Sequence, residues 1–192
     1  MSNPRIISGT ARGVRLQPVP GDITRPVTDR VKEAVYNIIS SDIVGANFLD
    51  LFGGTGSIGI EALSRGAAAV TFIDLHSQAI STIKANLKTT RLDTKARVVQ
   101  SDAFRYLAGS TPTPAYDYIY IAPPQYKQMW LQALRIVDEK PTWLVDDGWV
   151  IVQIHPIEYA EPNLTNLVEI DRRKYGSTLV LIYTLKEAVL IN

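Results

Sequence analysis

Short apolar runs alternate along this chain with longer segments in which apolar residues recur every three or four positions. The short runs are rich in β-branched and aromatic residues and predict strands, whereas the spacing of the longer segments predicts amphipathic helices. The predicted strands cover residues 48–52, 69–74, 97–100, 116–121 and 148–154, and the predicted helices cover 57–65, 77–89 and 129–137. Strands that alternate with helices favour an α/β fold with a mainly parallel sheet.

The two ends of the chain carry a different pattern. Residues 5–8 and 14–17 predict two short strands of a hairpin, separated by a segment that begins and ends with glycine. Thr28 then predicts the N-cap of a further helix. Residues 167–175 and 177–185 alternate around Gly176, which predicts an antiparallel hairpin at the edge of the sheet. We therefore expect a basic hairpin arm over residues 1–24 and a main domain over residues 25–192.

Composition limits the classes of protein that are possible. The chain has 192 residues, 46% of them hydrophobic, which is enough for one domain with a substantial core. It contains no cysteine and only two histidines, His76 and His155, so disulfides are excluded and a catalytic metal is not expected. The N-terminus lacks the apolar region of a signal peptide, and no apolar run approaches the roughly 20 residues of a membrane span. These features predict a soluble cytoplasmic protein.

Charge is distributed unevenly along the chain. The net charge is +1, yet residues 1–32 contain six basic residues against two acidic ones. Five of the six are arginines, whose planar guanidinium suits phosphate groups and base edges. A basic arm on a near-neutral body is typical of a contact with a nucleic-acid backbone. The alternative is a solvated surface hairpin, which charge alone does not exclude.

The segment from Asp50 to Gly59, DLFGGTGSIG, carries the strongest chemical signal. It joins a predicted strand to a predicted helix through a glycine turn, an arrangement that binds nucleotides. Residues 54–59 match the G-x-G-x-x-G fingerprint, and Asp74 follows about twenty residues later, as in dinucleotide sites. The carboxylate of Asp50 would repel a pyrophosphate but attract the ammonium of S-adenosylmethionine, so we favour that cofactor. An oxidoreductase that uses NAD stays possible, as does a purely structural Asp50 that caps the turn.

Acidic residues follow three successive predicted strands. They are Asp50, Asp74 and Asp102. Ligands of parallel α/β sheets bind at the carboxyl ends of the strands, where these side chains are expected to gather. Asp50 suits the methionine end of the cofactor, Asp74 the ribose hydroxyls and Asp102 the adenine amino group. Each acid could instead serve as a helix N-cap.

The chain resembles the class I S-adenosylmethionine methyltransferases, specifically the RsmD-type enzymes that methylate N2 of guanine 966 in 16S rRNA. The resemblance covers nearly the whole chain, and its most specific part is the arginine-rich sequence ahead of the glycine loop. The matching segments are residues 5–9 with 12–13, 25–33 (RPVTDRVKE), 50–56 (DLFGGTG) and 61–67 (EALSRGA). The resemblance implies a Rossmann-like fold with a seven-stranded, mostly parallel sheet and an antiparallel C-terminal hairpin strand.

The resemblance also implies roles for individual residues. The cofactor would be held by Asp50, Phe52, Gly53, Gly54, Gly56, Asp74, Asp102 and Ala103, and RNA by Arg5, Arg12, Arg15, Arg25 and Arg30. The catalytic segment would be Ala122, Pro123, Pro124, Gln125 and Tyr126. The partner would be 16S rRNA or a partly assembled small ribosomal subunit, met by a monomeric enzyme without a metal.

One position departs from the family pattern. The family usually has Asp or Asn before Pro-Pro and an aromatic residue directly after it, whereas this chain has Ala122 before the prolines and Gln125 before Tyr126. Backbone carbonyls of the Ala-Pro-Pro turn and the Gln125 side chain remain as acceptors for a guanine amine, and Tyr126 could stack on a flipped base. Three alternatives stay open: a non-catalytic factor that binds RNA and cofactor, a methyltransferase for adenine N6, and one for a glutamine amide.

Overall fold

The computed structural model describes residues 3–21, 27–109, 111–112, 114–125 and 127–187. The chain forms two compact units, Met1–Asp102 and Ala103–Asn192. Arg25 and Tyr126, two of the predicted site residues, lie outside the described residues. The division predicted at residues 24 and 25 stays a prediction.

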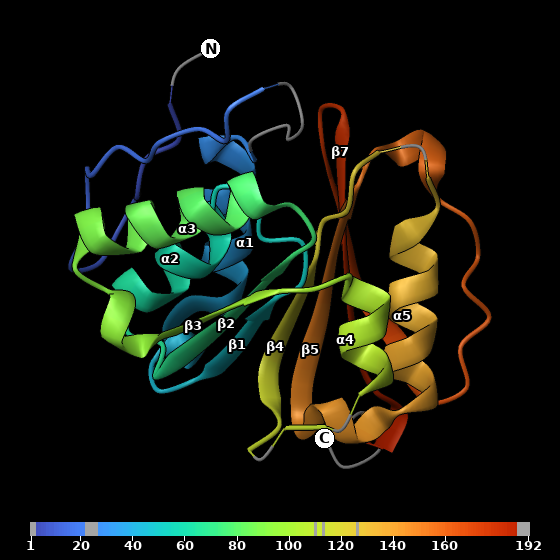
Figure 1. Cartoon of the computed structure of the whole chain (residues 1–192). Coiled ribbons are helices and arrows are strands. Elements are labelled where there is room, and N and C mark those ends of the chain that lie inside the picture. The colour runs from blue at the N-terminus through green and yellow to red at the C-terminus, as the bar shows by residue number, and fades with distance from the viewer. Residues whose placement is uncertain (1–2, 22–26, 110, 113, 126, 188–192) are drawn as a thin grey trace. The chain divides into compact units, whose positions relative to one another are not determined.

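In the described residues of the first unit, three α-helices pack with three parallel strands (Figure 1). Helix α2 contacts strands β1 and β2, and helix α3 contacts β2 and β3. The elements are α1 (Asp29–Ile39), η1 (Ser40–Ile43), β1 (Asn47–Asp50), α2 (Ser57–Ser64), β2 (Ala69–Asp74), α3 (Ser77–Thr90), η2 (Asp93–Lys95) and β3 (Ala96–Gln100). As predicted, Thr28 caps α1, with its hydroxyl accepting the Val31 amide over 3.4 Å.

The described residues of the second unit form two α-helices, two short 3-10 helices and four strands. Strands β4 and β5 are parallel, whereas β7 pairs antiparallel with both β5 and β6. Helices α4 and α5 contact each other, and α5 also packs on β4 and β5. The elements are α4 (Ala103–Ala108), β4 (Tyr116–Ile121), α5 (Met129–Glu139), η3 (Pro141–Trp143), β5 (Leu144–Ile154), η4 (Pro156–Glu158), β6 (Leu167–Tyr175) and β7 (Thr178–Leu185).

The strand order is β3-β2-β1-β4-β5-β7-β6 in a seven-stranded sheet. This order confirms the predicted α/β class, the mainly parallel sheet and the antiparallel C-terminal hairpin. The predicted strands 69–74 and 116–121 have the observed bounds. Strand β5 begins at Leu144, four residues before its predicted start, and α4 was not predicted. The four-residue difference covers Leu144–Asp147, where two adjacent aspartates interrupt the apolar run.

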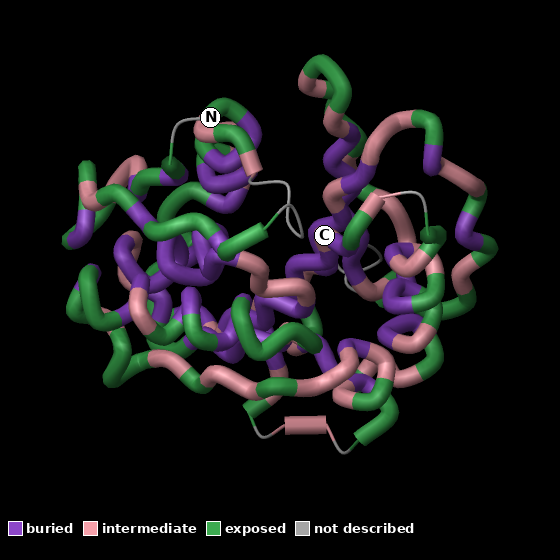
Figure 2. Tube along the Cα trace, turned by 45° about the horizontal axis from the view of Figure 1, so that its top comes forward, coloured by how far each residue is buried: buried purple, intermediate pink, exposed green. Residues whose placement is uncertain are grey.

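The N-terminal hairpin is present in reduced form. Arg5 and Arg15 form a single antiparallel bridge, and the Ile6 amide donates to the Val14 carbonyl over 2.9 Å. Ile6 and Leu16 are each 1% exposed, which anchors both halves of the arm in the core of the first unit. All eight residues of α2 are also buried, and buried residues are purple in Figure 2. The glycine loop therefore leads into a helix that is covered on all sides.

Candidate cofactor loop and RNA-binding arm

The glycine loop turns sharply between β1 and α2. Gly54 and Gly56 have φ angles of 54° and 77°, in the left-handed region that favours glycine. The Gly53 amide donates to the Ile73 carbonyl over 2.8 Å, and the Gly56 amide donates back to the Gly53 carbonyl over 2.7 Å. These bonds tie the loop to the end of β2 and close the turn immediately before α2. The sequence here therefore folds into the strand, turn and helix that nucleotide sites use.

Asp50 lies at the end of β1 beneath this loop. It is 2% exposed, and its Oδ2 accepts the Gly59 amide over 3.1 Å. Burial raises the pKa of Asp50 to about 7, and the neighbouring Asp74 adds to the rise, while the bond from Gly59 opposes it. Asp50 therefore caps α2 from inside, the structural role considered above, and it also places an ionisable group close to the loop.

Asp74 ends β2 and faces the loop from the other side. Its Oδ2 accepts the Gly54 amide and its Oδ1 accepts the His76 amide, each over 2.9 Å. Asp74 is half-buried, so its carboxylate oxygens keep acceptor capacity for a further donor. Asp102, also half-buried, follows β3, whose Gln100 is the register partner of Asp74. The first unit thus brings Asp50, Asp74 and the segment before Asp102 to one edge of its sheet, as predicted.

Leu75 is a site candidate that the sequence reasoning missed. It directly follows Asp74, and it is 56% exposed although most large apolar residues of the described chain are buried. An apolar side chain that leaves a strand beside an acid can cover the flat face of a purine. The available signal was its place one residue beyond the acidic end of an apolar strand.

The chemistry of the loop fits S-adenosylmethionine. Residues 50–59 contain no lysine or arginine that could neutralise a pyrophosphate. Lys32, which reaches the start of α2, is fully buried and bonded to Ser57 and paired with Glu61. Asp74 supplies acceptors for hydroxyl donors, and Asp50 supplies negative charge when it is ionised. A loop that has acidic residues beside it and no basic side chain for a phosphate suits a cationic nucleoside.

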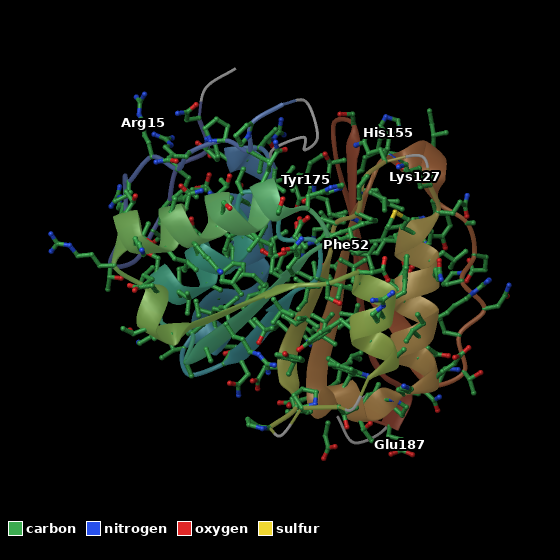
Figure 3. All side chains as sticks on the ribbon, in the orientation of Figure 1. Arg15, Phe52, Lys127, His155, Tyr175 and Glu187 are labelled. Atoms are coloured by element: carbon green, nitrogen blue, oxygen red, sulfur yellow. The ribbon has the colours of Figure 1, made fainter. Side chains whose placement is uncertain are left out.

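The arm and the first turn of α1 expose several of the predicted RNA-binding arginines. Arg12, Arg15 and Arg30 are exposed, and Arg15 extends away from the ribbon in Figure 3. The Arg5 guanidinium is also exposed, but it is paired with Asp29 over 2.8 Å. Lys32, which the sequence analysis counted among the six basic residues of positions 1–32, is fully buried on α1 and takes no part in this exposed surface.

The predicted catalytic segment begins where β4 ends. Ala122 and Gln125 are half-buried, Pro123 is buried and Pro124 is exposed. Two tyrosines of β4 pack against tryptophans of the same unit. The Tyr116 ring stacks on Trp143 with centroids 6.2 Å apart, and the Tyr118 ring meets Trp149 edge-on at 5.9 Å. These tyrosines serve the core of the second unit.

Metal ligands and membrane-spanning helices are two further features that concern the described part of the chain. It contains no group of three or more His, Cys, Asp or Glu side chains arranged to hold a metal ion. Within the same residues, no helix is long and apolar enough to cross a membrane.

The fold, the glycine loop and the acidic strand ends define a Rossmann-like protein of the methyltransferase type. The solved structure of Escherichia coli yhhF, provisionally titled a methyltransferase, has a TM-score of 0.83 to this chain at 31% identity, covering 94% of this chain and 97% of that one. A Bacillus subtilis relative, YlbH, provisionally named an rRNA methyltransferase, is 40% identical over 93% of this chain and 97% of its own length.

The particular family follows from the sequence. Residues 4–184 match the family described as "Conserved hypothetical protein 95", and the chain belongs to it. "Ribosomal RNA small subunit methyltransferase D" of Escherichia coli K12 is 37% identical over 78% of this chain and 73% of its own length. These findings confirm the RsmD-type resemblance.

Proposed function

We propose that this protein transfers a methyl group from S-adenosylmethionine to the exocyclic N2 of a guanine in 16S rRNA. The observation that carries the proposal is the glycine loop between two acidic strand ends, Asp50 and Asp74, in a chain of this family. The relatives named small-subunit rRNA methyltransferase D support rRNA as the substrate class. Guanine 966 is the target that the RsmD resemblance implies.

The glycine loop and the residues at the acidic strand ends bind the cofactor in this proposal. Asp74 accepts the ribose hydroxyls, Leu75 covers the adenine, and Asp102 with Ala103 meets the adenine amino group. Phe52, Gly53, Gly54 and Gly56 follow Asp50 around the methionine end. Asp50 contributes negative charge opposite the ammonium, and this contribution is full only above its pKa of about 7. When bound, the cofactor supplies an electrophilic methyl group on a sulfonium.

The segment after β4 orients the acceptor. A guanine N2 is a weak nucleophile because its lone pair is delocalised into the ring, so the protein must hold its hydrogens and direct the nitrogen at the methyl group. The Ala122 and Pro123 carbonyls and the Gln125 amide oxygen provide these acceptors. No strong base is needed, since the amine loses its proton after attack. Tyr126 stacks on the flipped base in this proposal.

The arm and the residues that follow it up to Arg30 bind the RNA backbone in this proposal. Arg12, Arg15 and Arg30 present exposed guanidinium groups to phosphates, and Arg5 and Arg25 belong to the same predicted set. A small ribosomal subunit or free 16S rRNA would meet these groups first. The cytoplasmic location and the monomeric state stay predictions.

The experiment that tests the proposal is direct. Small ribosomal subunits that lack the modification are incubated with the protein and S-adenosylmethionine labelled in the methyl group, and the digested RNA is analysed. Labelled N2-methylguanosine is expected. Asp74→Asn should raise the KM for S-adenosylmethionine and so lower the yield when this cofactor is limiting. Labelled N6-methyladenosine, or label in a protein glutamine, would replace this proposal with one of the alternatives.

Ala122 favours one second candidate. With alanine in place of the family's Asp or Asn, a side-chain acceptor is missing, and an amine misplaced by about 1 Å loses roughly a hundredfold in rate. A non-catalytic ribosome-assembly factor would bind both RNA and cofactor without transfer. Ala122→Asn separates the two: a large gain from an undetectable rate supports the factor, whereas a modest change in an active enzyme supports catalysis.

A further inference from the structure

The turn of the arm lies directly on helix α2, where Ser64 holds it. The Ser64 hydroxyl donates to the Ser8 carbonyl over 2.6 Å and accepts the Ala11 amide over 2.9 Å. The Thr10 amide donates to the Ser64 carbonyl over 2.8 Å. Gly9 passes so close that a Cβ at this position would lie 1.8 Å from the same carbonyl oxygen. A side chain at position 9 would therefore push the turn of the arm away from α2.

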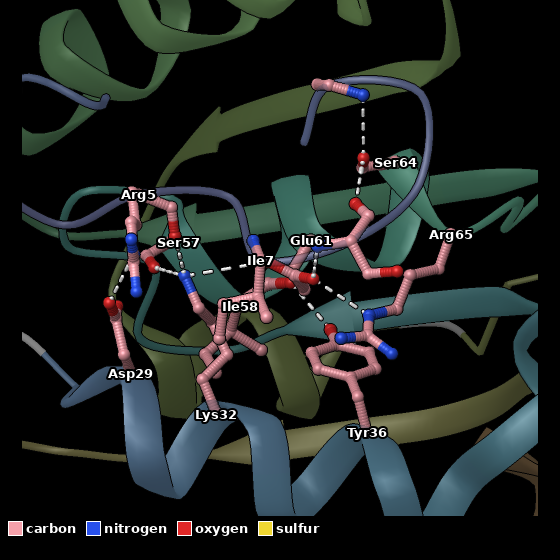
Figure 4. Close-up of polar contacts among 12 residues, drawn as sticks. Arg5, Ile7, Asp29, Lys32, Tyr36, Ser57, Ile58, Glu61, Ser64 and Arg65 are labelled. Carbon is pink, nitrogen blue, oxygen red and sulfur yellow. Dashed lines mark hydrogen bonds and ion pairs between the residues drawn. The ribbon is translucent and has the colours of Figure 1, made fainter. Parts of the chain in front are cut away.

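A buried ion pair lies beneath the first half of the arm (Figure 4). The Nζ of Lys32, on α1, is 3.6 Å from Oε2 of Glu61, on α2, and both side chains are fully buried. The Glu61 carboxylate accepts the amides of Ile7 and Ser8 over 2.8 and 2.9 Å, and the Lys32 ammonium donates to the Arg5 carbonyl. The backbone of the arm, together with the Arg65 guanidinium 2.8 Å from Glu61 Oε1, therefore satisfies both buried charges, as a buried ion pair requires.

The same buried groups also hold the glycine loop. Lys32 Nζ donates to the Ser57 hydroxyl over 2.9 Å, at the first residue of α2. Asn86 of α3, which is fully buried, donates through Nδ2 to the Thr55 carbonyl over 2.9 Å and to the Gln17 carbonyl over 3.0 Å. Its Oδ1 accepts the Gln17 amide over 2.7 Å. Lys32 and Asn86 thus each connect a residue of the arm to a residue of the loop region.

We propose that Lys32, Glu61 and Asn86 are positioning residues that couple RNA binding on the arm to cofactor binding at the glycine loop. The coupling rests on the proposed function, which places RNA on the arm. If the arm leaves α2, Lys32 and Asn86 lose their arm partners and turn toward water, and their bonds to Ser57 and Thr55 are released. Docking of the arm and order in the loop therefore support each other.

RNA favours the docked arm because docking fixes the direction of the exposed arginines. Arg12 and Arg15 lie on a backbone that Ser64 and Glu61 hold in place, so their side chains meet phosphates without the cost of ordering the chain. Linkage then requires that the cofactor strengthen RNA binding by the same factor by which RNA strengthens cofactor binding.

The experiment measures this factor directly. The affinity of unmodified small ribosomal subunits for the protein is determined by filter binding, with and without saturating S-adenosylhomocysteine. The wild-type protein should bind subunits at least about fivefold more tightly when S-adenosylhomocysteine is present. The ratio of the two affinities is the readout, and it is compared among variants that urea unfolding shows to be fully folded without the ligand, because S-adenosylhomocysteine would refold a partly unfolded variant and raise the ratio.

Gly9→Ala and Gly13→Ala form a matched pair. Both glycines have a φ of +83°, so alanine brings the same backbone strain at each, but a Cβ at Gly13 meets nothing within 4 Å. Gly9→Ala should reduce the affinity ratio toward one, and Gly13→Ala should keep the wild-type ratio. A wild-type ratio in a folded Gly9→Ala protein overturns the coupling.

The roles of the buried residues are tested separately. The double variant Lys32→Met/Glu61→Gln removes both buried charges at similar volume, and Asn86→Leu removes the second connection. Both should bring the ratio close to one while all arginines remain. Thr90→Val is the control for Asn86→Leu, since the Thr90 hydroxyl bonds only carbonyls of its own helix, over 2.9 and 3.0 Å. A ratio unchanged in both test variants also contradicts the assignment.

Two outcomes of the experiment separate this inference from the proposed function. If Arg12→Ala and Arg15→Ala leave subunit binding unchanged, or if subunits do not bind at all, the assignment of RNA to the arm has failed. If subunits bind through these arginines and the wild-type ratio is one, the coupling is overturned and the proposed function stands.

Discussion

Asp50 has surroundings that differ sharply from water. Its carboxyl group is fully enclosed by the first unit and has one backbone donor, Gly59, so its charged form is poorly compensated. The unfolded chain carries the same group at an ordinary pKa near 3.8, whereas the folded protein raises it to about 7. At a pH between these two pKa values, Asp50 keeps its proton in the folded state and has lost it in the unfolded state.

The sign of the pH effect follows from this difference. Because the folded state binds the additional proton, the contribution of Asp50 to the free energy of unfolding is largest below about pH 4 and declines until pH passes 7. Asp50→Asn is neutral throughout and still offers an oxygen to Gly59. The free energy of unfolding of Asp50→Asn minus that of wild type should therefore be larger at pH 8 than at pH 5, as measured by urea unfolding at both values.

The same substitution, Asp50→Asn, should weaken ligand binding at the pH at which it increases stability. At pH 8 the ionised Asp50 attracts the ammonium of the cofactor, so Asp50→Asn should weaken S-adenosylhomocysteine binding in calorimetry while it stabilises the unliganded protein. An equal stability difference at pH 5 and pH 8 would show that the raised pKa is wrong. Unchanged affinity at pH 8 would remove Asp50 from the cofactor site.

At the scale of elements, α2 is held by contacts on every side. Its Gly59 approaches β2 so closely that a Cβ would lie 2.3 Å from Cε1 of Phe72 and 2.8 Å from Cγ1 of Val70. The Tyr36 hydroxyl of α1 donates to the Ile58 carbonyl over 2.6 Å, and the Arg65 guanidinium lies 4.8 Å from the Tyr36 ring centroid. The last glycine of the fingerprint thus serves the packing of a helix on a strand.

Gly59→Ala should be destabilising for this reason. The clash with an aromatic ring in a close-packed layer costs about 1–3 kcal/mol, more than the helix propensity of alanine returns. The measurement is the midpoint of urea unfolding. In the double variant Gly59→Ala/Phe72→Leu the smaller side chain makes room, so the two substitutions should be less costly together than the sum of their separate effects. Strict additivity would argue against the contact.

Sequence pattern was most informative about these elements. The apolar strand at residues 69–74, the Thr28 cap and the turn at Gly176 depend on local chemistry, and all three are present in the structure. Helix α4 was missed because its six residues are too few to show a periodic pattern. The Asp50 cap on Gly59 could be considered from sequence but not decided, since burial and hydrogen bonding emerge only when the chain folds.

At the scale of the whole molecule, the basic residues among the first thirty-two positions fall into two groups, one buried in an ion pair and one exposed. Sequence counts Lys32 with the arginines, because nothing in its neighbours shows that it turns inward from the amphipathic face of α1. The structure buries Lys32 against Glu61 and leaves Arg12, Arg15 and Arg30 outside. A partner 29 residues away in sequence is the kind of information that pattern reasoning lacks.

Salt dependence should distinguish these two groups. Each phosphate contact that an exposed arginine makes adds about 0.7–0.9 to the slope of log affinity against log salt concentration. Arg12→Ala and Arg15→Ala should each flatten that slope by about this amount in filter binding to small subunits. Arg97→Ala, on the exposed side of β3, is the control and should leave the slope unchanged. A slope that both arm variants leave at its wild-type value would contradict a phosphate-binding arm.

The close fit of Gly9 on Ser64 also limits how this protein can be recombined. An arm from another family member would need a glycine at this point, together with backbone groups spaced to meet Lys32, Glu61 and Asn86. Arms and helices are therefore expected to be inherited as one unit, and chimeras should be joined after α3 rather than after the arm.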